Sequence, residues 1–368
     1  MSRRNGGRHR RRTASPIPHS RPWLTAADAR AVNAVVRSGR LSPSPVVEQF
    51  ETEVARTLGV AGAAAVSSGT AALYLALRAL GVGPRDEVVM PSYVCSALLH
   101  ATEATGATAR LVDVDPETCN LSPDDARRRL RRRTKALILP HLFGLPADLR
   151  DVLALGPPVI EDCAQTLGVT YRGRPVGSFG VAAVCSFYAT KLVAAGEGGM
   201  VASNSAALLE KIRKGRSYDE RPRYSSGFNF KLSGLHAALG LSQLRRLPLM
   251  LARRRRIARR YDQALAGLPW CGPASPADRD HAYHRYVVRV PGGADRVMAC
   301  LMSLGVTARR PVYRPIHRCI GQRGFPVTDR LWREALSLPI YPALTRRELE
   351  RIVTALSEAA RLCRRRRP

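Results

Sequence analysis

Lysine, acidic side chains and long apolar runs are all scarce in this chain. Only five of its 59 basic residues are lysines, and 29 acidic residues leave a formal net charge of +30 over 368 residues. No uninterrupted apolar stretch approaches the roughly 18 residues that a membrane-spanning helix needs. The basic N-terminus lacks the apolar core of a secretory signal. These absences predict a chain with no membrane partner, and hydrophobic residues at 45% exclude disorder for most of it.

Paired cysteines are also missing. The chain has eight cysteines, but none forms a Cys-x-x-Cys pair and no group of cysteines and histidines has the spacing of a zinc site. Several lie inside apolar runs, where cysteine behaves as a small hydrophobic residue. We therefore predict a reduced, cytoplasmic protein without a bound metal.

The positive charge is unevenly distributed. Residues 1–22 contain seven arginines and no acid, which predicts a disordered basic tail, and arginines are again dense in 361–367. Two explanations remain for the arginines between these ends: solvated helix faces, or contacts with anionic substrates or nucleic acid. A nucleic-acid partner is not favoured, because the chain has no helix-turn-helix signature, zinc site or patch of basic and aromatic residues.

Short β-branched runs alternate with longer helical patterns from about residue 60 to residue 205. This alternation is typical of an α/β fold with a mostly parallel sheet between helices. We predict a large domain over residues 23–248 and a smaller α+β domain over 249–368. Seven strands are expected, over 63–67, 87–90, 109–114, 136–139, 159–161, 182–186 and 199–203.

Four segments at strand ends carry the candidate chemistry. Ser67–Ala71 joins a strand to a helix, where backbone N–H groups and the helix dipole suit an anion. Val159–Asp162 is an apolar strand that ends in two acids. Ser186–Lys191 places a hydroxyl and an amine just past another strand, and Gly196–Gly199 forms a tight reversal into the next.

Each of these segments has an ordinary structural explanation when it is taken singly. A Ser-Gly-Thr helix start is common capping, a strand-end acid is commonly a cap or an ion-pair member, and a lone lysine is usually a surface residue. Together and in this order they supply a phosphate cradle, a carboxylate and an amine on one sheet. Those are the groups that hold pyridoxal 5'-phosphate.

The chain resembles the DegT/StrS-type sugar aminotransferases, which are fold-type-I pyridoxal-phosphate enzymes. The resemblance extends from about Ser38 to Leu356. Its motifs are 38–42, 68–73, 83–93, 112–116, 141–148, 160–165, 186–191, 196–200, 227–233, 237–243 and 338–345.

The resemblance implies a role for each residue of the constellation. Lys191 bonds covalently to the cofactor and moves the proton, and Asp162 keeps the pyridine nitrogen protonated. Gln165 hydrogen-bonds the phenolic oxygen of the cofactor. Gly69, Thr70, Ala71 and Ser186 bind the phosphate, and Asn229 reaches the phosphate from a partner subunit. A homodimer with shared active sites is therefore expected.

Two regions depart from the pattern of the family or are less specific. Cys95 stands where the family usually stacks an aromatic ring on the cofactor, and Tyr93 is a second candidate for that contact. Arg309, Tyr313 and His317 belong to a segment that resembles the substrate-side loop, where arginine suits a nucleotide diphosphate. A basic loop with a packed histidine explains that segment equally well.

Lys191 favours transamination, since relatives with histidine at that position remove a hydroxyl instead. We expect an amino acid, with L-glutamate as the first choice, to donate an amine that a nucleotide-linked keto sugar accepts in aminosugar biosynthesis. Two alternatives remain: amination of a keto-cyclitol, and a non-catalytic regulatory or nucleic-acid-binding protein on the same fold.

Overall fold

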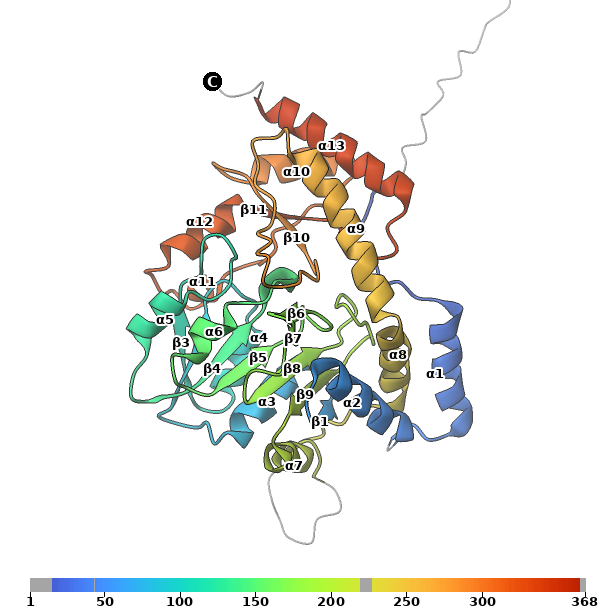
Figure 1. The fold of residues 1–368 in the computed structure, drawn as a ribbon, viewed down its shortest axis with the longest axis vertical. Coiled ribbons are helices and arrows are strands. Elements are labelled where there is room, and N and C mark those ends of the chain that lie inside the picture. Colours follow the sequence, from blue (N-terminus) through green and yellow to red (C-terminus); the bar gives the residue numbers. More distant parts are fainter. Residues whose placement is uncertain (1–14, 43, 219–226, 365–368) are drawn as a thin grey trace, which may run out of the picture.

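A computed structural model describes residues 15–42, 44–218 and 227–364 of the chain. At its centre is a seven-stranded sheet in the order β1-β9-β8-β5-β4-β2-β3 (Figure 1). The strands are β1 (Gly62–Val66), β2 (Glu87–Pro91), β3 (Thr108–Val112), β4 (Thr134–Pro140), β5 (Val159–Asp162), β8 (Ala182–Ser186) and β9 (Gly199–Ser203). The predicted α/β class and its seven strands are confirmed. β9 runs antiparallel to both of its neighbours, and every other pairing in the sheet is parallel.

Helices cover both faces of this sheet. Two small strand pairs and one short 3-10 turn are the other described elements. The helices are α1 (Ala26–Ser38), α2 (Pro45–Leu58), α3 (Gly69–Ala79), α4 (Ala97–Glu103), α5 (Pro123–Arg129), α6 (Leu149–Leu153), α7 (Ala206–Gly215), α8 (Gly234–Arg245), α9 (Leu247–Leu265), α10 (Asp295–Ser303), α11 (Ile316–Cys319), α12 (Pro326–Glu334) and α13 (Arg346–Arg364). The remaining elements are η1 (Leu142–Gly144), β6 (Thr170–Tyr171), β7 (Arg174–Pro175), β10 (Tyr286–Arg289) and β11 (Ala335–Leu338). Among the described helices, none is long and apolar enough to span a bilayer.

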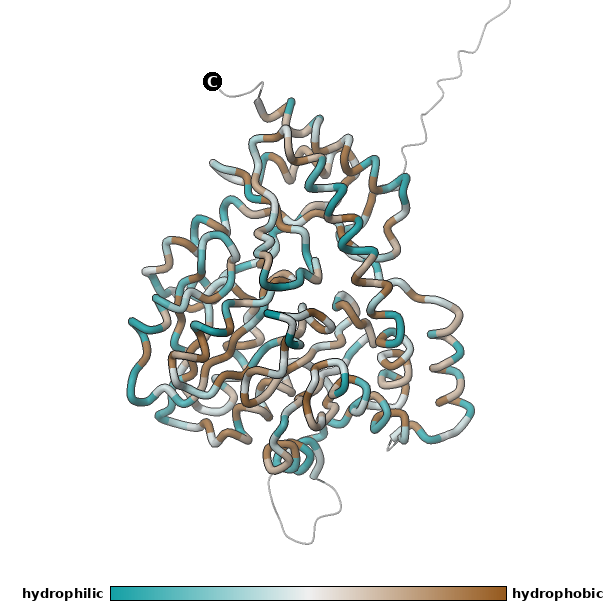
Figure 2. The backbone as a smooth tube through the Cα atoms, in the orientation of Figure 1, coloured by the Kyte–Doolittle hydropathy of each residue, from teal (hydrophilic) through white to brown (hydrophobic). Residues whose placement is uncertain are grey.

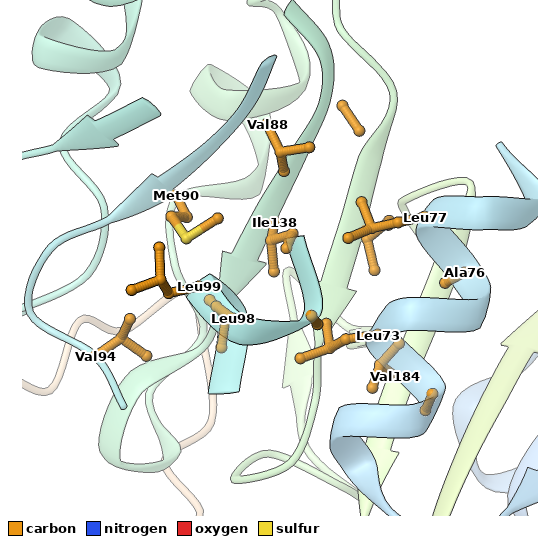
Figure 3. Close-up of a cluster of buried hydrophobic side chains, with 14 of the residues drawn as sticks. Leu73, Ala76, Leu77, Val88, Met90, Val94, Leu98, Leu99, Ile138 and Val184 are labelled. Carbon is orange, nitrogen blue, oxygen red and sulfur yellow. The ribbon is translucent and has the colours of Figure 1, made fainter. Parts of the chain in front are cut away.

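The two faces of the sheet bury separate apolar clusters, because successive side chains of a strand point to opposite faces. On one face, Met90, Ile138 and Val184 of the strands pack against α3 and α4 (Figure 3). On the other face, neighbouring residues such as Leu137 and Met200 pack against α2, α6 and α8. The hydropathy colouring shows the apolar segments gathered in this central region (Figure 2).

The C-terminal part has its own core, and α9 extends from the sheet region into it (Figure 1). β10 and β11 pair antiparallel and pack with α10 and α13. The segment from Val312 to Ala335 departs from the expected division, because its buried residues join the core of the large domain. Asp113, just after β3, holds the start of α12 by accepting hydrogen bonds from the N–H groups of Val327 and Thr328.

The N-terminal segment also differs from the predicted tail. Residues 1–14 lie outside the described part, but residues 15–22 are ordered against the C-terminal domain. Ile17 is 1% exposed and belongs to that domain's core. Its N–H donates to the Gly305 oxygen at 2.9 Å, and its oxygen accepts from the Thr307 N–H at 3.0 Å. The arginine-rich composition of 1–22 concealed this anchor, so the prediction of disorder was wrong for residues 15–22.

Candidate active site

Three strand ends bring the expected cofactor residues to one edge of the sheet. β8 runs parallel to β5 and antiparallel to β9, and β1 is also antiparallel to β9, so β1, β5 and β8 point the same way. Ser67 follows β1, while β5 ends at Asp162 and β8 ends at Ser186. In open α/β sheets, ligands bind at the carboxyl edge of the strands. The predicted residues therefore converge where a ligand site is expected.

The first turn of α3 and the end of β8 approach each other closely. Ser68 is the N-cap of α3, and its Oγ accepts a hydrogen bond from the Ala71 N–H at 3.1 Å. The N–H groups of Gly69 and Thr70 precede that bond and have no acceptor within the helix. A Cβ on Gly69 would lie 2.9 Å from Ser186 Cβ, so only glycine allows this approach. The result is a cradle of N–H groups and a hydroxyl that suits a phosphate.

Ala71, which was predicted to bind the phosphate, and Gly199, which was predicted to form part of a turn, both have a structural role at this cradle. Ala71 is buried and its N–H is used by the cap, so it stabilises the helix start and leaves the free N–H groups to Gly69 and Thr70. Gly199 lies between Val66 and Ser186 in the sheet, where a Cβ would be 2.2 Å from the Ser68 oxygen. The glycine at this strand start therefore allows the cradle to form.

Asp162 and Lys191 lie close enough to influence each other's charge. Burial raises the pKa of the Asp162 carboxyl, and the Lys191 ammonium opposes that shift. Asp162 Oδ1 accepts a hydrogen bond from the Ala164 N–H at 3.0 Å, which fixes the carboxylate. Lys191 lies in the connection between β8 and β9, where its N–H donates to the Tyr188 oxygen at 2.8 Å. The amine and the carboxylate therefore face one site from adjacent strands.

Cys95 faces the same two groups. Desolvation raises the pKa of the Cys95 thiol, Lys191 opposes the shift, and Asp162 adds to it. The residue is exposed, whereas Tyr93 is fully buried and packs edge-on against Phe143 with ring centroids 6.1 Å apart. Of the two candidates for the ring contact, Cys95 is thus the one that the fold places beside Lys191 and Asp162.

The side chain of Gln165 is oriented by the turn that follows β4. Its Oε1 accepts a hydrogen bond from the Phe143 N–H at 2.8 Å. Phe143 has φ 61° and ψ 6°, a left-handed conformation that is uncommon for a bulky residue. Because the oxygen is held by this turn, the amide NH₂ of Gln165 is the end that can donate to an acceptor such as a phenolic oxygen.

A fully buried carboxylate with a histidine partner lies behind Asp162. Glu161 accepts hydrogen bonds from the N–H groups of Gly177, Phe179 and Gly180 at 2.7–2.8 Å, and from His141 Nε2 at 3.2 Å. His141 Nδ1 accepts from a backbone N–H, which assigns the ring proton to Nε2. His141, Glu161 and Cys163 have the spacing of a metal cluster. Hydrogen bonds already occupy both histidine nitrogens and both carboxylate oxygens, so these residues form a structural support for β5.

The substrate-side residues separate in the structure. Arg309 and Tyr313 line a cleft of about 1180 Å³ next to Thr190, and Tyr313 is 91% exposed. His317 is buried instead, with Nδ1 2.6 Å from Ser92 Oγ and its ring stacked on Phe325. Its expected place among the substrate contacts is corrected, because these contacts fix it in the interior.

Asn229 lies apart from the cleft on an exposed segment beyond α7. The segment is tied to β1, since the Ser67 N–H donates to the Phe230 oxygen at 2.7 Å. Phe228 and Phe230 stack at 4.8 Å, and Asn229 between them is exposed. Within one chain, then, nothing in the described part covers this asparagine.

The geometry fits pyridoxal 5'-phosphate. The cradle at Gly69 and Ser186 matches its phosphate, the half-buried Asp162 matches a protonated ring nitrogen, and Lys191 matches its aldehyde. An α/β fold with these groups at one sheet edge defines a pyridoxal-phosphate-dependent transferase. The chain belongs to the DegT/DnrJ/EryC1/StrS aminotransferase family, which matches residues 22–357. It is a pyridoxal-phosphate-dependent aminotransferase.

Similar proteins cover nearly the whole chain. The spore coat polysaccharide biosynthesis protein SpsC of Bacillus subtilis (strain 168) is 35% identical over 93% of this chain and 96% of its own length. The aminotransferase TlmJ of Streptoalloteichus hindustanus has a TM-score of 0.91 and 33% identity, over 95% of this chain and all of its own. DesV of S. venezuelae, solved in complex with a ketimine intermediate, has a TM-score of 0.86 and 35% identity, over 91% of this chain and 94% of its own.

Sequence reasoning missed several residues that line the cleft, among them His19 and Arg285. His19 lies in the segment that was predicted to be a disordered tail, and no motif distinguished Arg285 from the many other arginines. A signal for His19 existed, since Ile17 is an apolar residue two positions before it, in a stretch otherwise rich in arginine.

Proposed function

We propose that this aminotransferase transfers an amine from an amino acid, with L-glutamate as the expected donor, to a nucleotide-linked keto sugar. The observation that carries the proposal is the arrangement at the sheet edge, where Lys191 and Asp162 adjoin the Gly69–Ser186 cradle beside an arginine-lined cleft. Its relatives include a polysaccharide biosynthesis protein and a sugar aminotransferase of Micromonospora echinospora, CalS13, at 30% identity.

Each residue at the edge has a defined part in this proposal. When bound, pyridoxal phosphate supplies a ring that draws electrons from the carbon next to the transferred amine. Lys191 Nζ takes the proton from that carbon and returns it. The Asp162 carboxylate keeps the pyridine nitrogen of the cofactor protonated and therefore positively charged. The cradle at Gly69 and Thr70 fixes the phosphate. Gln165 orients the phenolic oxygen through its NH₂ group.

The cleft favours a phosphate-bearing substrate over a neutral cyclitol. Arg309, Arg310, Arg314 and Arg318 line it together with Trp332. Arg310 and Arg318 lie over the Trp332 ring, at 4.5 and 4.3 Å from its centroid, and are already paired with Asp295 and Asp329. Arg309 and Arg314 form no ion pair in the described part of the chain. Arginine binds phosphate oxygens in bidentate fashion, and an uncharged ring substrate offers these cations no negative charge.

The direct test is an assay of purified protein with L-glutamate and a panel of keto acceptors. We expect formation of 2-oxoglutarate and amination of a nucleotide-linked keto sugar. Turnover with keto-inositols alone would instead support the cyclitol alternative. Lys191→Ala should abolish both turnover and the borohydride-reducible bond to the cofactor. Lys135→Ala is the matched control, since Lys135 is exposed on β4 at the opposite edge of the sheet. A Lys191→Ala protein with wild-type turnover would overturn the proposal.

We further propose a homodimer in which Asn229 completes the partner's phosphate site. Phe228 beside it is 41% exposed, and Tyr188, near Lys191, is 47% exposed. Exposed aromatic residues of this kind mark interaction surfaces. Mixed dimers of Lys191→Ala and Asn229→Ala chains test the sharing of sites. If Asn229 acts in the partner's site, each mixed dimer keeps one intact site and activity returns. If it acts within its own chain, every site carries one defect and mixing restores nothing.

A further inference from the structure

The N-terminal segment Ser15–Trp23 is fixed at both of its ends. At one end, Ile17 is buried in the C-terminal core and pairs with Val306. At the other end, Trp23 lies under two arginines, with Arg253 of α9 4.5 Å and Arg246, between α8 and α9, 5.1 Å from its ring centroid. Between these anchors, Arg21 forms an ion pair with Glu348 at 3.1 Å. The segment therefore has one defined course across the surface.

That course forms one wall of the cleft beside the catalytic lysine. Pro18, His19 and Ser20 line the 1180 Å³ cleft, which Thr190 also lines. Ser20 to Trp23 line a second, small cavity together with Thr190 and Lys191. The segment thus contacts the same space as the loop that carries Lys191, although about 170 residues separate them.

His19 connects this wall to Arg285. Its Nε2 lies 2.9 Å from Ser337 Oγ and 3.4 Å from Arg285 Nη1. A guanidinium only donates hydrogen bonds, so Nε2 is the accepting nitrogen and Nδ1 carries the proton. Burial, together with the charges of Arg285 and Arg309, lowers the pKa of His19 to about 3. His19 is therefore a neutral acceptor that orients Arg285.

Arg285 is a partly desolvated cation without an acidic partner in the described part of the chain. Its backbone N–H donates to the Phe143 oxygen at 3.1 Å, which places it beside the turn that orients Gln165. Burial lowers the pKa of Arg285, while nearby Cys95 acts in the opposite direction. Cys95 also interacts with Lys191 and Asp162, so Arg285 lies on the cofactor side of the cleft. A cation held in this way stabilises an anion that enters the cleft.

We propose that Ser15–Trp23 is a wall of the active site, and that His19 is a positioning residue that holds Arg285 as the binding group for a substrate oxyanion. The proposal rests on the function proposed above. Two groups have this chemistry: the carboxylate of the amino donor and a phosphate of the keto acceptor. They enter the cleft in separate half-reactions, so they can be distinguished experimentally.

The test follows both half-reactions of the holoenzyme by cofactor absorbance, with L-glutamate in one arm and the keto acceptor in the other. His19→Ala and Arg285→Gln should raise the half-saturation concentration about tenfold in one arm, as expected for loss of one charge-assisted hydrogen bond. The maximal rate should change much less. An effect in the glutamate arm assigns the carboxylate, and an effect in the acceptor arm assigns the phosphate.

Three control proteins separate positioning from stability. His19→Asn retains a side-chain acceptor and should restore most of the affinity. His100→Ala, at an exposed position of α4, should behave as wild type. Deletion of residues 2–14 should also leave both arms unchanged, whereas deletion of 2–22 removes the Ile17 anchor and should reproduce the His19→Ala defect. Unchanged half-saturation in both arms for His19→Ala would overturn the proposal, and so would equal defects in His19→Ala and His19→Asn.

A binding measurement distinguishes failure of this proposal from failure of the proposed function. Thermal shifts with inorganic pyrophosphate and with 2-oxoglutarate report oxyanion binding without turnover. A wild-type protein that shows no transamination, yet loses one of these shifts on Arg285→Gln, would contradict the function and retain the site. Turnover in wild type with shifts that are unaffected by Arg285→Gln would contradict the site alone.

Discussion

Replacement of Glu161 by glutamine should be among the most destabilising isosteric changes in this protein. Each Glu161 oxygen accepts two hydrogen bonds: Oε1 from the N–H groups of Phe179 and Gly180, and Oε2 from Gly177 and His141. An amide has only one oxygen, so in either orientation its NH₂ faces two donors. His141 cannot change tautomer without losing the Ala147 N–H bond to Nδ1.

The cost follows from the orphaned donors. Leaving a buried donor unsatisfied costs about 1–3 kcal/mol, so two such donors cost about 2–6 kcal/mol. Urea denaturation of the wild-type and Glu161→Gln proteins measures the difference. Glu53→Gln is the control, because its ion pair with Arg56 is exposed and should cost less than about 1 kcal/mol.

The pH dependence gives an independent test of the same carboxylate. Hydrogen bonds from His141 and from the backbone outweigh burial and hold the pKa of Glu161 below its ordinary value. A lowered folded-state pKa contributes stability above the unfolded-state pKa, and that stability is lost as pH falls through the folded-state value. The wild-type advantage over Glu161→Gln should therefore be full at neutral pH and shrink in acid. A difference below about 1 kcal/mol at neutral pH would refute the reasoning, since two orphaned donors cannot cost so little.

Three further changes test other parts of the structure. Asp162→Asn should lower turnover by on the order of 100-fold with the fold intact, because it removes a charge at the reacting site; steady-state kinetics measures this, and exposed Asp151→Asn should have no effect. Cys95 and Cys319 are both exposed, but the raised pKa of Cys95 should make iodoacetamide label it more slowly at pH 8 than Cys319, and cofactor should slow it further; equal rates by peptide mass spectrometry would contradict this. Gly240→Ala should cost about 1–3 kcal/mol, because its Cβ would lie 2.7 Å from the Phe50 ring between α2 and α8. In thermal melts, Gly267→Ala, with nothing within 4 Å, should melt as wild type does.

The elements that could be predicted are those set by local pattern. The strands alternate with helices in the sequence, so their number and the α/β class followed from periodicity, and the structure confirms both. The anion cradle at Gly69 was predicted because a helix begins there directly after a strand. The family and the cofactor followed from the ordered motifs and are confirmed by the family match over residues 22–357. The roles of the individual site residues remain predictions.

Other features depended on contacts between distant segments. Tyr93 and Cys95 are two residues apart, and only the fold decides that Tyr93 is buried against Phe143 while Cys95 faces Lys191. His317 was predicted as a substrate contact because its segment resembles the substrate-side loop of the family. Its partner Ser92 lies 225 residues earlier in the chain, so no local pattern could have placed it in the interior.

The sequence by itself determined the chemistry of this protein, because that chemistry needs a lysine, a carboxylate and a glycine-bearing helix start, which lie within short motifs at strand ends. The tertiary structure alone decided what surrounds them. Burial of Ile17 turns an arginine-rich N-terminus into a wall of the cleft and brings His19 to Arg285, 266 residues away. Burial and long-range hydrogen bonds are properties of the folded chain, and they determine which of its many arginines line the cleft.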